Sequence, residues 1–360
     1  MFELSTFPVR PELSLPEILV YAFISFTLAL LLTKRFVKIL HTYKIGKKLR
    51  VEAVDGGSAS VFLQYHQNKK GTPTMGGVLI WGSILITVLL SRALSYFGVV
   101  DHSLLQRGQV YVPLGMMVGF GLLGAVDDYM NVAGIGKNKG MNWLPKISAL
   151  IIMSALAASW FYFKNGYMSI HVPFGESLGL ASSTLHLGWL YIPFAIFVII
   201  GTANAVNVTD GLDGLAGGLL IIAFGSFAII AYASGLYVLA GFCAVVVGAI
   251  AAFLWHNVPP ALFYMGDTGA LALGGTLAVI AFMINHVLLL PLIGLVFVAE
   301  MLSVIIQLTS KKFFKRKVFK SAPFHHHLEA LEWGESKVTM RLWIVGAFAA
   351  ILGVLVGFYG

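Results

Sequence analysis

The chain has 360 residues, of which 58% are hydrophobic and only 11% are charged. This composition excludes a water-soluble globular domain and indicates a membrane protein. The net charge of +8 does not require a nucleic-acid partner to explain it, because membrane proteins concentrate Lys and Arg in the loops of one face. The single cysteine, Cys243, excludes an intramolecular disulfide.

Apolar runs long enough to cross a hydrocarbon core of ~30 Å recur from one end of the chain to the other. We predict ten membrane-spanning helices, at about 18–33, 76–90, 110–126, 147–163, 187–206, 214–233, 236–256, 269–285, 287–308 and 342–359. The first run has no basic segment before it and no small-residue cleavage site after it, so we expect it to be retained. Very short connections after residues 233 and 285 predict two helical hairpins. The predicted fold class is all-α, a polytopic membrane protein whose single domain takes up 1–360.

Basic residues are distributed unequally between the two sets of loops. The loops at 34–75, 127–146 and 309–341 contain twenty Lys and Arg residues, and the opposite set contains four. By the positive-inside rule the basic set is cytoplasmic, so both termini are expected on the non-cytoplasmic side. The same alternation places the loops 207–213 and 257–268 on the cytoplasmic face.

Five of the sixteen acidic residues occupy three short breaks between the apolar runs. They are Asp127 and Asp128 in AVDDY, Asp210 and Asp213 in NVTDGLDGL, and Asp267 in YMGDTG. The predicted topology puts all three breaks on the cytoplasmic face, where the five carboxylates can converge on one site. Clustered carboxylate oxygens suit a hard cation such as Mg²⁺, which usually bridges to a phosphate-bearing substrate.

Asp127 and Asp128 follow an apolar run directly, where a helix leaves the bilayer. Neighbouring carboxylates repel each other unless a cation or a proton separates them, and at a helix C-terminus they also oppose the helix dipole. A solvated helix end is the simpler interpretation, but it would favour Lys at these positions. We prefer an interpretation in which a metal, a metal-bound phosphate or a proton transfer offsets that cost.

Polar side chains accompany the other aspartates. Asn207, Asp210 and Asp213 recur at a spacing of three, which places them on one face if the turn is helical. Asn257 and Tyr264 lie in the break that contains the fifth aspartate, and an aromatic ring beside an amide and a carboxylate suits a stacked base. A polar turn with side-chain caps would need fewer such groups, so we prefer a ligand site.

Two further segments of the cytoplasmic face carry groups that can bind phosphate. KKGTPTMGG contains Lys69 and Thr74 just before the second span, and APFHHHLE contains His325, His326 and His327. Three consecutive His side chains cannot all point in one direction. Phosphate binding by one or two of them is therefore a better hypothesis than a three-His zinc site.

Two features allow more than one interpretation. The basic run KKFFKRKVFK over 311–320 is explained as well by contact with anionic lipid as by contact with a substrate phosphate. Glu300 is the only acidic residue well inside a predicted span, and it is either a buried residue with a partner or part of a broken helix.

Taken in order, KKGTPTMGG, AVDDY, NAVNVTDGLDGLAGG, YMGDTGALALGG and APFHHHLE resemble the phospho-N-acetylmuramoyl-pentapeptide transferase family. The resemblance runs from about residue 18 to the C-terminus, and the family's ten-span topology agrees with the count above. It implies transfer of phospho-MurNAc-pentapeptide from UDP-MurNAc-pentapeptide to undecaprenyl phosphate in the bacterial inner membrane, giving lipid I and UMP, with Mg²⁺ as cofactor. The sequence leaves the oligomeric state open, with a homodimer as one option.

The resemblance also implies roles for individual residues. It implies that Asp267 is the magnesium ligand. The catalytic residues that it implies are Asp127, Asp128, Asp210, Asp267, His325, His326 and His327. The substrate-binding residues that it implies are Lys69, Thr74, Asn207, Asp213, Asn257 and Tyr264.

The sequence departs from the family pattern after the aspartate pair. The family often has a basic residue in the motif DDYxK, where this chain has Asn131. The next basic residues are Lys137, Lys139 and Lys146, and the sequence does not show which of them meets phosphate. Nothing is carried over for 42–68, which diverges from the pattern.

Two mechanisms are compatible with these residues. We prefer direct attack by the lipid phosphate, with Asp127 or Asp128 removing its proton, because that phosphate is already mostly anionic at neutral pH. The alternative is a covalent phospho-aspartyl intermediate. Exchange of labelled UMP into the UDP-sugar without lipid acceptor would contradict direct attack.

Three other functions compete with this prediction. A sister polyprenyl-phosphate GlcNAc-1-phosphate transferase would share the aspartate loops but use UDP-GlcNAc. A secondary transporter would place ionisable groups near the bilayer midplane, often with repeat symmetry, whereas five carboxylates here line one edge. A non-enzymatic scaffold gives no reason for aspartates in three separate loops.

Overall fold

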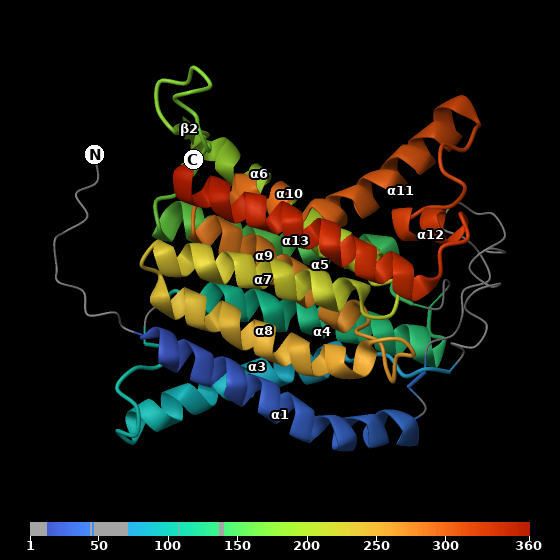
Figure 1. Ribbon diagram of the computed structural model, residues 1–360, viewed down its shortest axis with the longest axis horizontal. Coiled ribbons are helices and arrows are strands. Elements are labelled where there is room, and N and C mark those ends of the chain that lie inside the picture. Colours follow the sequence, from blue (N-terminus) through green and yellow to red (C-terminus); the bar gives the residue numbers. More distant parts are fainter. Residues whose placement is uncertain (1–12, 44, 47–70, 107, 137–139) are drawn as a thin grey trace.

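The computed structural model describes residues 13–43, 45–46, 71–106, 108–136 and 140–360. Most of its long helices run side by side along the long axis of the molecule (Figure 1). They are α1 (Leu15–Thr42), α3 (Gly77–Tyr96), α4 (Tyr111–Ala133), α5 (Trp143–Ser159), α6 (Tyr191–Thr209), α7 (Leu215–Ala233), α8 (Tyr237–Asn257), α9 (Asp267–Met283), α11 (Leu295–Phe314) and α13 (Glu335–Tyr359). The shorter helical segments are η2 (Trp160–Lys164), η3 (Gly188–Leu190), η4 (Val287–Leu289), α10 (Leu290–Ile293) and α12 (Phe324–Glu329).

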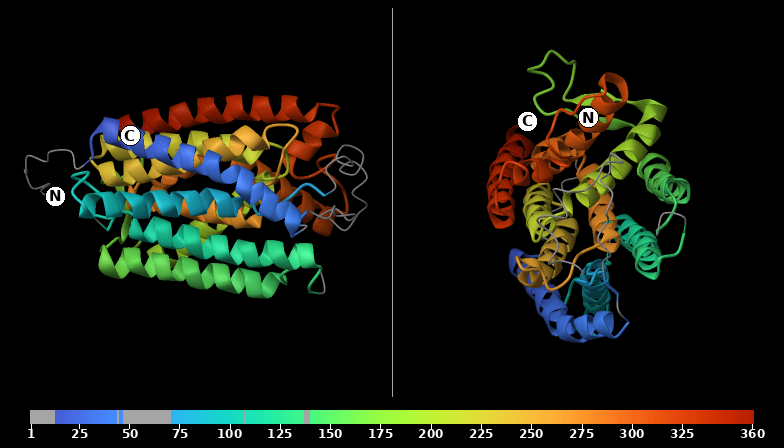
Figure 2. Two further views of the ribbon diagram at one scale, coloured as in Figure 1. Left: turned by 90° about the horizontal axis from the view of Figure 1, so that it is seen from below. Right: turned by 90° about the vertical axis from the view of Figure 1, so that its right-hand side faces the viewer.

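A helix occupies each of the ten predicted spans, which confirms the all-α fold class. Seven helices in the described part of the chain are long and apolar enough to cross a membrane, and α10 with α11 would be an eighth if the bent pair is one span. The start of α1 and the end of α13 lie at the same end of the bundle (Figures 1 and 2), as an even number of crossings requires. Which compartment this end faces, and the single-domain assignment, stay predictions.

The connection between α5 and α6 contains a small sheet that we did not predict. Strands β1 (Ser169–His171) and β2 (Thr184–His186) pair antiparallel, with Ile170 opposite Leu185. Each strand has only three residues, too few for an alternating pattern to be visible in the sequence.

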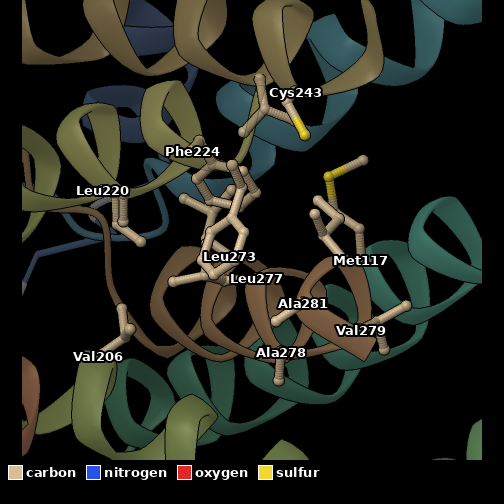
Figure 3. Close-up of a cluster of buried hydrophobic side chains, with 14 of the residues drawn as sticks. Met117, Val206, Leu220, Phe224, Cys243, Leu273, Leu277, Ala278, Val279 and Ala281 are labelled. Carbon is tan, nitrogen blue, oxygen red and sulfur yellow. The ribbon is translucent and has the colours of Figure 1, made fainter. Parts of the chain in front are cut away.

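Helix α9 forms the centre of the bundle. It is buried from its second residue to its sixteenth, because it is apolar on all sides and is surrounded by α3, α4, α6 and α7. Close packing against α6 depends on Gly274, where a Cβ would lie 2.7 Å from the Cα of Ala203. Figure 3 shows Leu273 and Leu277 of α9 in the same apolar cluster as Phe224 of α7. The centre of the bundle therefore holds α9, and with it Asp267, in a fixed position.

The two predicted hairpins have different outcomes. The first is confirmed, since α7 and α8 pack together across a short turn. In the second, the chain reverses after α9, but the segment 287–293 and α11 are bent by 81° around Gly294. Helix α11 then packs against α6 and α13 and leaves the bundle (Figure 1). Glu300 follows this break by six residues and is fully buried, so both interpretations offered for it hold in part.

One end of the bundle gathers the described parts of the aspartate, KKGTPTMGG and APFHHHLE segments. Helices α4, α6 and α8 end there, and α5, α7, α9 and α13 begin there, beside α12 (Figures 1 and 2). It is opposite the end at which the chain leaves α13. We call it the aspartate end.

Candidate active site

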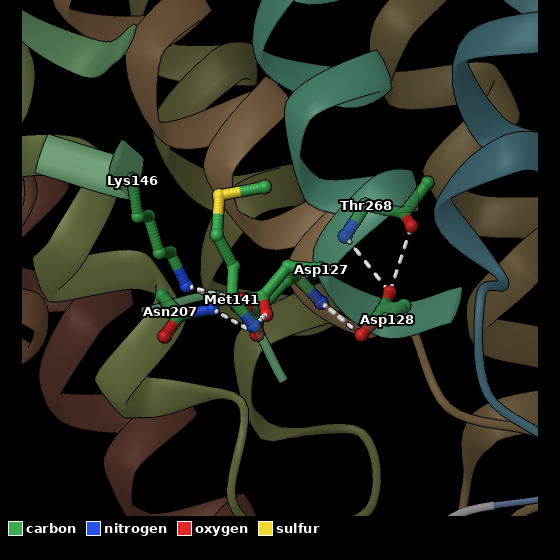
Figure 4. Close-up of polar contacts among 7 residues, drawn as sticks. Asp127, Asp128, Met141, Lys146, Asn207 and Thr268 are labelled. Atoms are coloured by element: carbon green, nitrogen blue, oxygen red, sulfur yellow. Dashed lines mark hydrogen bonds and ion pairs between the residues drawn. The ribbon is translucent and has the colours of Figure 1, made fainter. Parts of the chain in front are cut away.

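Asp128 lies in the last turns of α4 and caps the N-terminus of α9 (Figure 4). Its carboxylate accepts hydrogen bonds from the N–H of Asp267 at 3.2 Å and from the N–H and hydroxyl of Thr268 at 3.0 and 2.7 Å. The helices approach this closely because α4 has Gly124 at the crossing, where a Cβ would collide with the backbone of Asp267 and Thr268. Free N–H groups at a helix N-terminus favour a negative charge. A carboxylate that is unfavourable at the end of its own helix is thus stabilised by the start of another.

The protonation of Asp128 is poised near neutral pH. This residue lies beyond the apolar run 110–126 and is 8% exposed. Burial and the neighbouring negative charge of Asp267 raise the pKa of Asp128 to about 7, although its hydrogen bonds to Thr268 and Asp267 act in the opposite direction. A carboxyl group whose pKa is near the working pH can both take up and release a proton.

Lys146 connects Asp127 to Asp267. Figure 4 shows Lys146 among the labelled residues around Asp127. It comes from the first turn of α5, and its ammonium donates to the Asp127 carboxylate at 2.7 Å and to the Asp267 carboxylate. Asp127 also accepts the backbone N–H of Met141 at 2.8 Å, and Asp267 accepts the side-chain amide of Asn207 at 2.8 Å. Carboxylates from α4 and α9 therefore share one cation. Their hydrogen-bond donors come from α5, from the loop before α5 and from α6.

These contacts keep Asp267 ionised. Burial alone would raise the pKa of Asp267, but the ammonium of Lys146, a hydrogen bond with the Asp127 carboxyl group and the amide of Asn207 hold it at about 2. The sequence left open which of three lysines takes the place of the family's basic residue after the aspartate pair. Lys146 reaches the aspartates, whereas Lys137 and Lys139 lie outside the described residues, so the structure does not compare the three as partners of a phosphate.

Asp127 and Asp267 are the carboxylates best placed to hold a metal ion. They come from different helices, yet both contact one cation, the ammonium of Lys146. Their oxygens are hard donors of the kind that Mg²⁺ prefers. The described residues contain no group of three or more His, Cys, Asp or Glu arranged to hold a metal. One or two carboxylates together with waters and substrate phosphate are a donor set that Mg²⁺ typically uses, and Asp127 and Asp267 could supply the carboxylates.

Asp210 joins the loop after α6 to the turn that starts α9. Its carboxylate accepts the N–H of Gly266 at 3.2 Å. Gly266 has a φ of 72°, and a Cβ there would lie 2.7 Å from the hydroxyl of Thr74 and collide with the Asp128 carboxylate. The turn before Asp267 therefore brings Asp128, Asp210 and Thr74 to within contact of one glycine, which confirms that the three aspartate loops converge.

Asp213 and Asn257 hold two loops together. The Asp213 carboxylate accepts the N–H of Ala261 at 2.9 Å, and the Asn257 side chain accepts from Gly214 at 3.0 Å and donates to the carbonyl of Phe263 at 2.9 Å. Both side chains are only 3% exposed. These contacts shape the loop that carries the predicted nucleoside pocket, and the roles of the two residues in binding stay predictions.

Glu335 is a residue of this region that the sequence analysis missed. It lies in the first turn of α13, and its carboxylate accepts the backbone N–H of Asp213 at 2.8 Å. The only sequence signal was an acidic residue at the start of an apolar helix, which is common for dipole reasons alone.

The segment with Thr74 is bound to the loop with Tyr264. The N–H of Tyr264 donates to the carbonyl of Pro73 and its carbonyl accepts from Gly76, both at 2.8 Å. Thr74 is buried. Lys69, predicted to bind substrate, lies outside the described residues.

The three consecutive histidines point to different partners, as predicted. His326 forms a 2.6 Å contact with Glu329, and the ring of His327 accepts the N–H of Lys320 at 3.2 Å. His325 faces the interior and is 1% exposed. The predicted binding of phosphate by this loop stays a prediction.

His325 gives the site a pH-dependent contribution to stability. Burial would lower the pKa of His325, but Glu300, whose carboxylate lies 3.0 Å from Nδ1, raises it overall. A raised folded-state pKa stabilises the protein fully below the unfolded value of about 6.5, and the stabilisation is lost as the pH rises through the folded value.

We therefore expect His325→Gln to lower the melting temperature more at pH 6 than at pH 8.5, by about 2 °C or more. Thermal unfolding in detergent at both pH values measures this difference. His186→Gln, an exposed histidine of β2, is the control and should change the melting temperature equally at both. Equal effects of His325→Gln at the two pH values would contradict the assignment.

Comparison with known proteins agrees with the motifs. The model of glycosyl transferase family 4 matches residues 110–285, and signature 1 of phospho-N-acetylmuramoyl-pentapeptide-transferase matches residues 69–80. A phospho-N-acetylmuramoyl-pentapeptide-transferase of Geobacillus sp. is 39% identical over 95% of this chain and 98% of its own length. The protein of that name from Oceanobacillus iheyensis is 40% identical over 96% and 99%, and the one from Chloroflexus aurantiacus 39% over 93% and 88%.

Proposed function

The chain belongs to the phospho-N-acetylmuramoyl-pentapeptide transferase family, and we propose that it transfers phospho-MurNAc-pentapeptide from UDP-MurNAc-pentapeptide to undecaprenyl phosphate, giving lipid I and UMP. The observation that carries the proposal is the convergence of Asp127, Asp128 and Asp267 with Lys146 at one end of a helical membrane bundle. We propose that a soluble nucleotide reaches that end from the aqueous side and that a lipid phosphate reaches it without leaving the bilayer. We place the aspartate end on the cytoplasmic face of the bacterial inner membrane.

Phosphoryl transfer from a pyrophosphate needs charge neutralisation and in-line positioning more than covalent chemistry. Lys146 supplies a positive charge between the carboxylates, and its flexible side chain can turn to a phosphate oxygen. When bound at Asp267, Mg²⁺ would neutralise charge on the pyrophosphate and on the departing UMP. The remaining task, placing the acceptor phosphate and taking its proton, falls to the aspartate pair.

The two members of the pair have different surroundings. Asp127 is tied to Lys146 at 2.7 Å, whereas Asp128 caps α9. Burial raises the pKa of both carboxyl groups, to about 7 for Asp128. The pKa of Asp128 matches neutral pH, and Asp127 is the more exposed of the two, because Asp128 is buried and Asp127 only partly so. We propose direct attack by the lipid phosphate with one of these two groups as base.

The donor separates this function from that of a sister enzyme. We expect purified protein with undecaprenyl phosphate and Mg²⁺ to release UMP from both donors with different efficiency. The kcat/KM for UDP-MurNAc-pentapeptide should exceed that for UDP-GlcNAc at least 100-fold, a difference of about 2.7 kcal/mol in transition-state binding. The muramyl signature over 69–80 favours this result. UMP release measured in detergent, without any vesicle, also tests the transporter alternative. Preference for UDP-GlcNAc would contradict the proposal and support the sister function.

A further inference from the structure

Glu300 and His325 form a buried pair next to the aspartate loops. Glu300 lies in α11 just after the 81° bend, and His325 lies in α12. The Glu300 carboxylate accepts the backbone N–H of His325 at 3.1 and 3.2 Å and contacts the ring Nδ1 at 3.0 Å. Because a carboxylate can only accept, Nδ1 must carry a proton. The backbone and ring contacts together fix both the position of α12 and the orientation of the ring.

The opposite edge of the ring meets the loop between α6 and α7. Nε2 of His325 is buried and has no hydrogen-bond partner among the described residues. It faces Gly211, where a Cβ would lie 2.8 Å from Cε1 of the ring and still closer to Nε2. Glycine is needed at this position for space, so that the backbone of the loop can rest on the imidazole edge.

The loop that rests on this ring carries two of the five aspartates. Asp210 precedes Gly211 and holds the turn before α9 through Gly266, and Asp213 follows and holds the next loop through Ala261. A shift of the ring would therefore act on the loop that carries both carboxylates. Among the described residues, the hydrogen bonds of the Glu300 carboxylate go to His325 and not to the aspartates, so its influence passes through His325.

We propose that Glu300 is a positioning residue: it holds the His325 ring against Gly211 and so places the loop that carries Asp210 and Asp213. The kinetic consequences rest on the proposed transferase function, whereas the effect on the loop does not. Other charged groups near His325 are Glu329 of the same helix, which pairs with His326, and Glu335 of α13, which holds the N–H of Asp213. Neither contacts the ring nitrogens as Glu300 does.

A double-mutant cycle in the full-length protein tests this relay. The variants are Glu300→Gln, His325→Gln and the two combined. The control is Glu17→Gln, which alters a second Glu–His pair, with His102 at 3.7 Å, in the first turn of α1. Helix α1 begins at the opposite end of the bundle (Figure 1). Hydrogen exchange of residues 207–214 is measured in detergent without ligand, and kcat and both KM values are measured for lipid I formation.

We expect exchange of 207–214 at least fivefold faster in Glu300→Gln than in the wild type, with no change in Glu17→Gln. The kcat should fall at least tenfold, with the KM for the lipid acceptor within twofold. In the His325→Gln background, Glu300→Gln should cause no further change in either measurement, because residues that act through one another are not additive.

The proposal would be overturned if the loss of kcat in the double variant equalled the product of the losses in the two single variants. It would also be overturned if Glu300→Gln lost activity while exchange of 207–214 stayed unchanged. If the wild type forms no lipid I, the proposed function fails, and the exchange cycle alone decides the positioning role. If Glu300→Gln does not fold, Gly211→Ala tests the same contact from the loop side without removing a charge. It should accelerate exchange of 207–214 as well, and wild-type exchange in Gly211→Ala would overturn the proposal.

Discussion

Asp267→Asn should lower kcat for lipid I formation by about 10²–10³-fold, the usual effect of removing one electrostatic contact from a transition state. The carboxylate pairs with Lys146 and accepts from Asn207, and it is the proposed magnesium ligand. An amide in its place has one acceptor oxygen. If that oxygen faces Asn207, the amide NH₂ faces the ammonium of Lys146, and two donors confront each other. The lysine then pairs with Asp127 alone, and the bridge between α4 and α9 is lost.

The measurement combines kinetics with metal binding. Asp267→Asn should also weaken Mn²⁺ binding, followed by electron paramagnetic resonance as a substitute for Mg²⁺. Asp101→Asn is the matched control, because Asp101 is exposed and lies before α4 at the opposite end of the bundle. It should retain activity within twofold. Asp267→Asn with more than a tenth of wild-type kcat, or with unchanged Mn²⁺ affinity, would show that the ligand assignment is wrong.

The part of the architecture that depends on apolar runs could be predicted from the sequence. A span needs about 20 residues whatever its neighbours are, so each run predicts a helix and the loops alternate between faces. The same alternation of loops predicts that the five aspartates lie at one end of the bundle. The run around the bend contains Pro291 and Gly294, and a broken helix was one of the two interpretations of Glu300. The position and angle of the bend could not be predicted, because both residues are also tolerated inside continuous membrane helices. The three-residue strands β1 and β2 were too short to recognise.

The contacts of the site were harder to predict than its location. Asp128 and Asp213 are bound largely by backbone N–H groups, of Thr268 and Ala261 among others, and every residue except proline carries such a group. The side-chain sequence therefore does not predict which residues donate to these carboxylates. Lys146 was one of three candidate lysines, since the loop after α4 does not by its length decide which one returns to the aspartates. The family pattern likewise could not separate residues that shape a loop from those that touch a ligand.

Lys146→Met should abolish most activity, lower stability without metal and make the protein more responsive to magnesium. The methionine side chain has similar length and no charge, so Asp127 and Asp267 would face each other without a cation between them. Breaking this partly buried pair should reduce the free energy of unfolding by about 2 kcal/mol. The same two carboxylates would then have no internal competitor for a divalent cation. Mg²⁺ should therefore raise the melting temperature of Lys146→Met by more than it raises that of the wild type, because a ligand that binds only the folded state stabilises it.

Thermal unfolding of both proteins across a Mg²⁺ titration, with kcat measured in parallel, separates the two roles of this lysine. Lys164→Met is the control, because Lys164 is exposed at the far end of the helical segment that begins with α5. It should match the wild type in activity and in its response to Mg²⁺. A larger Mg²⁺ response combined with lost activity in Lys146→Met means that the ammonium both occupies the position between the carboxylates and serves the reaction. An equal or smaller Mg²⁺ response would mean that Lys146 and the metal do not share the carboxylates, and the magnesium site would then have to be sought away from Asp127.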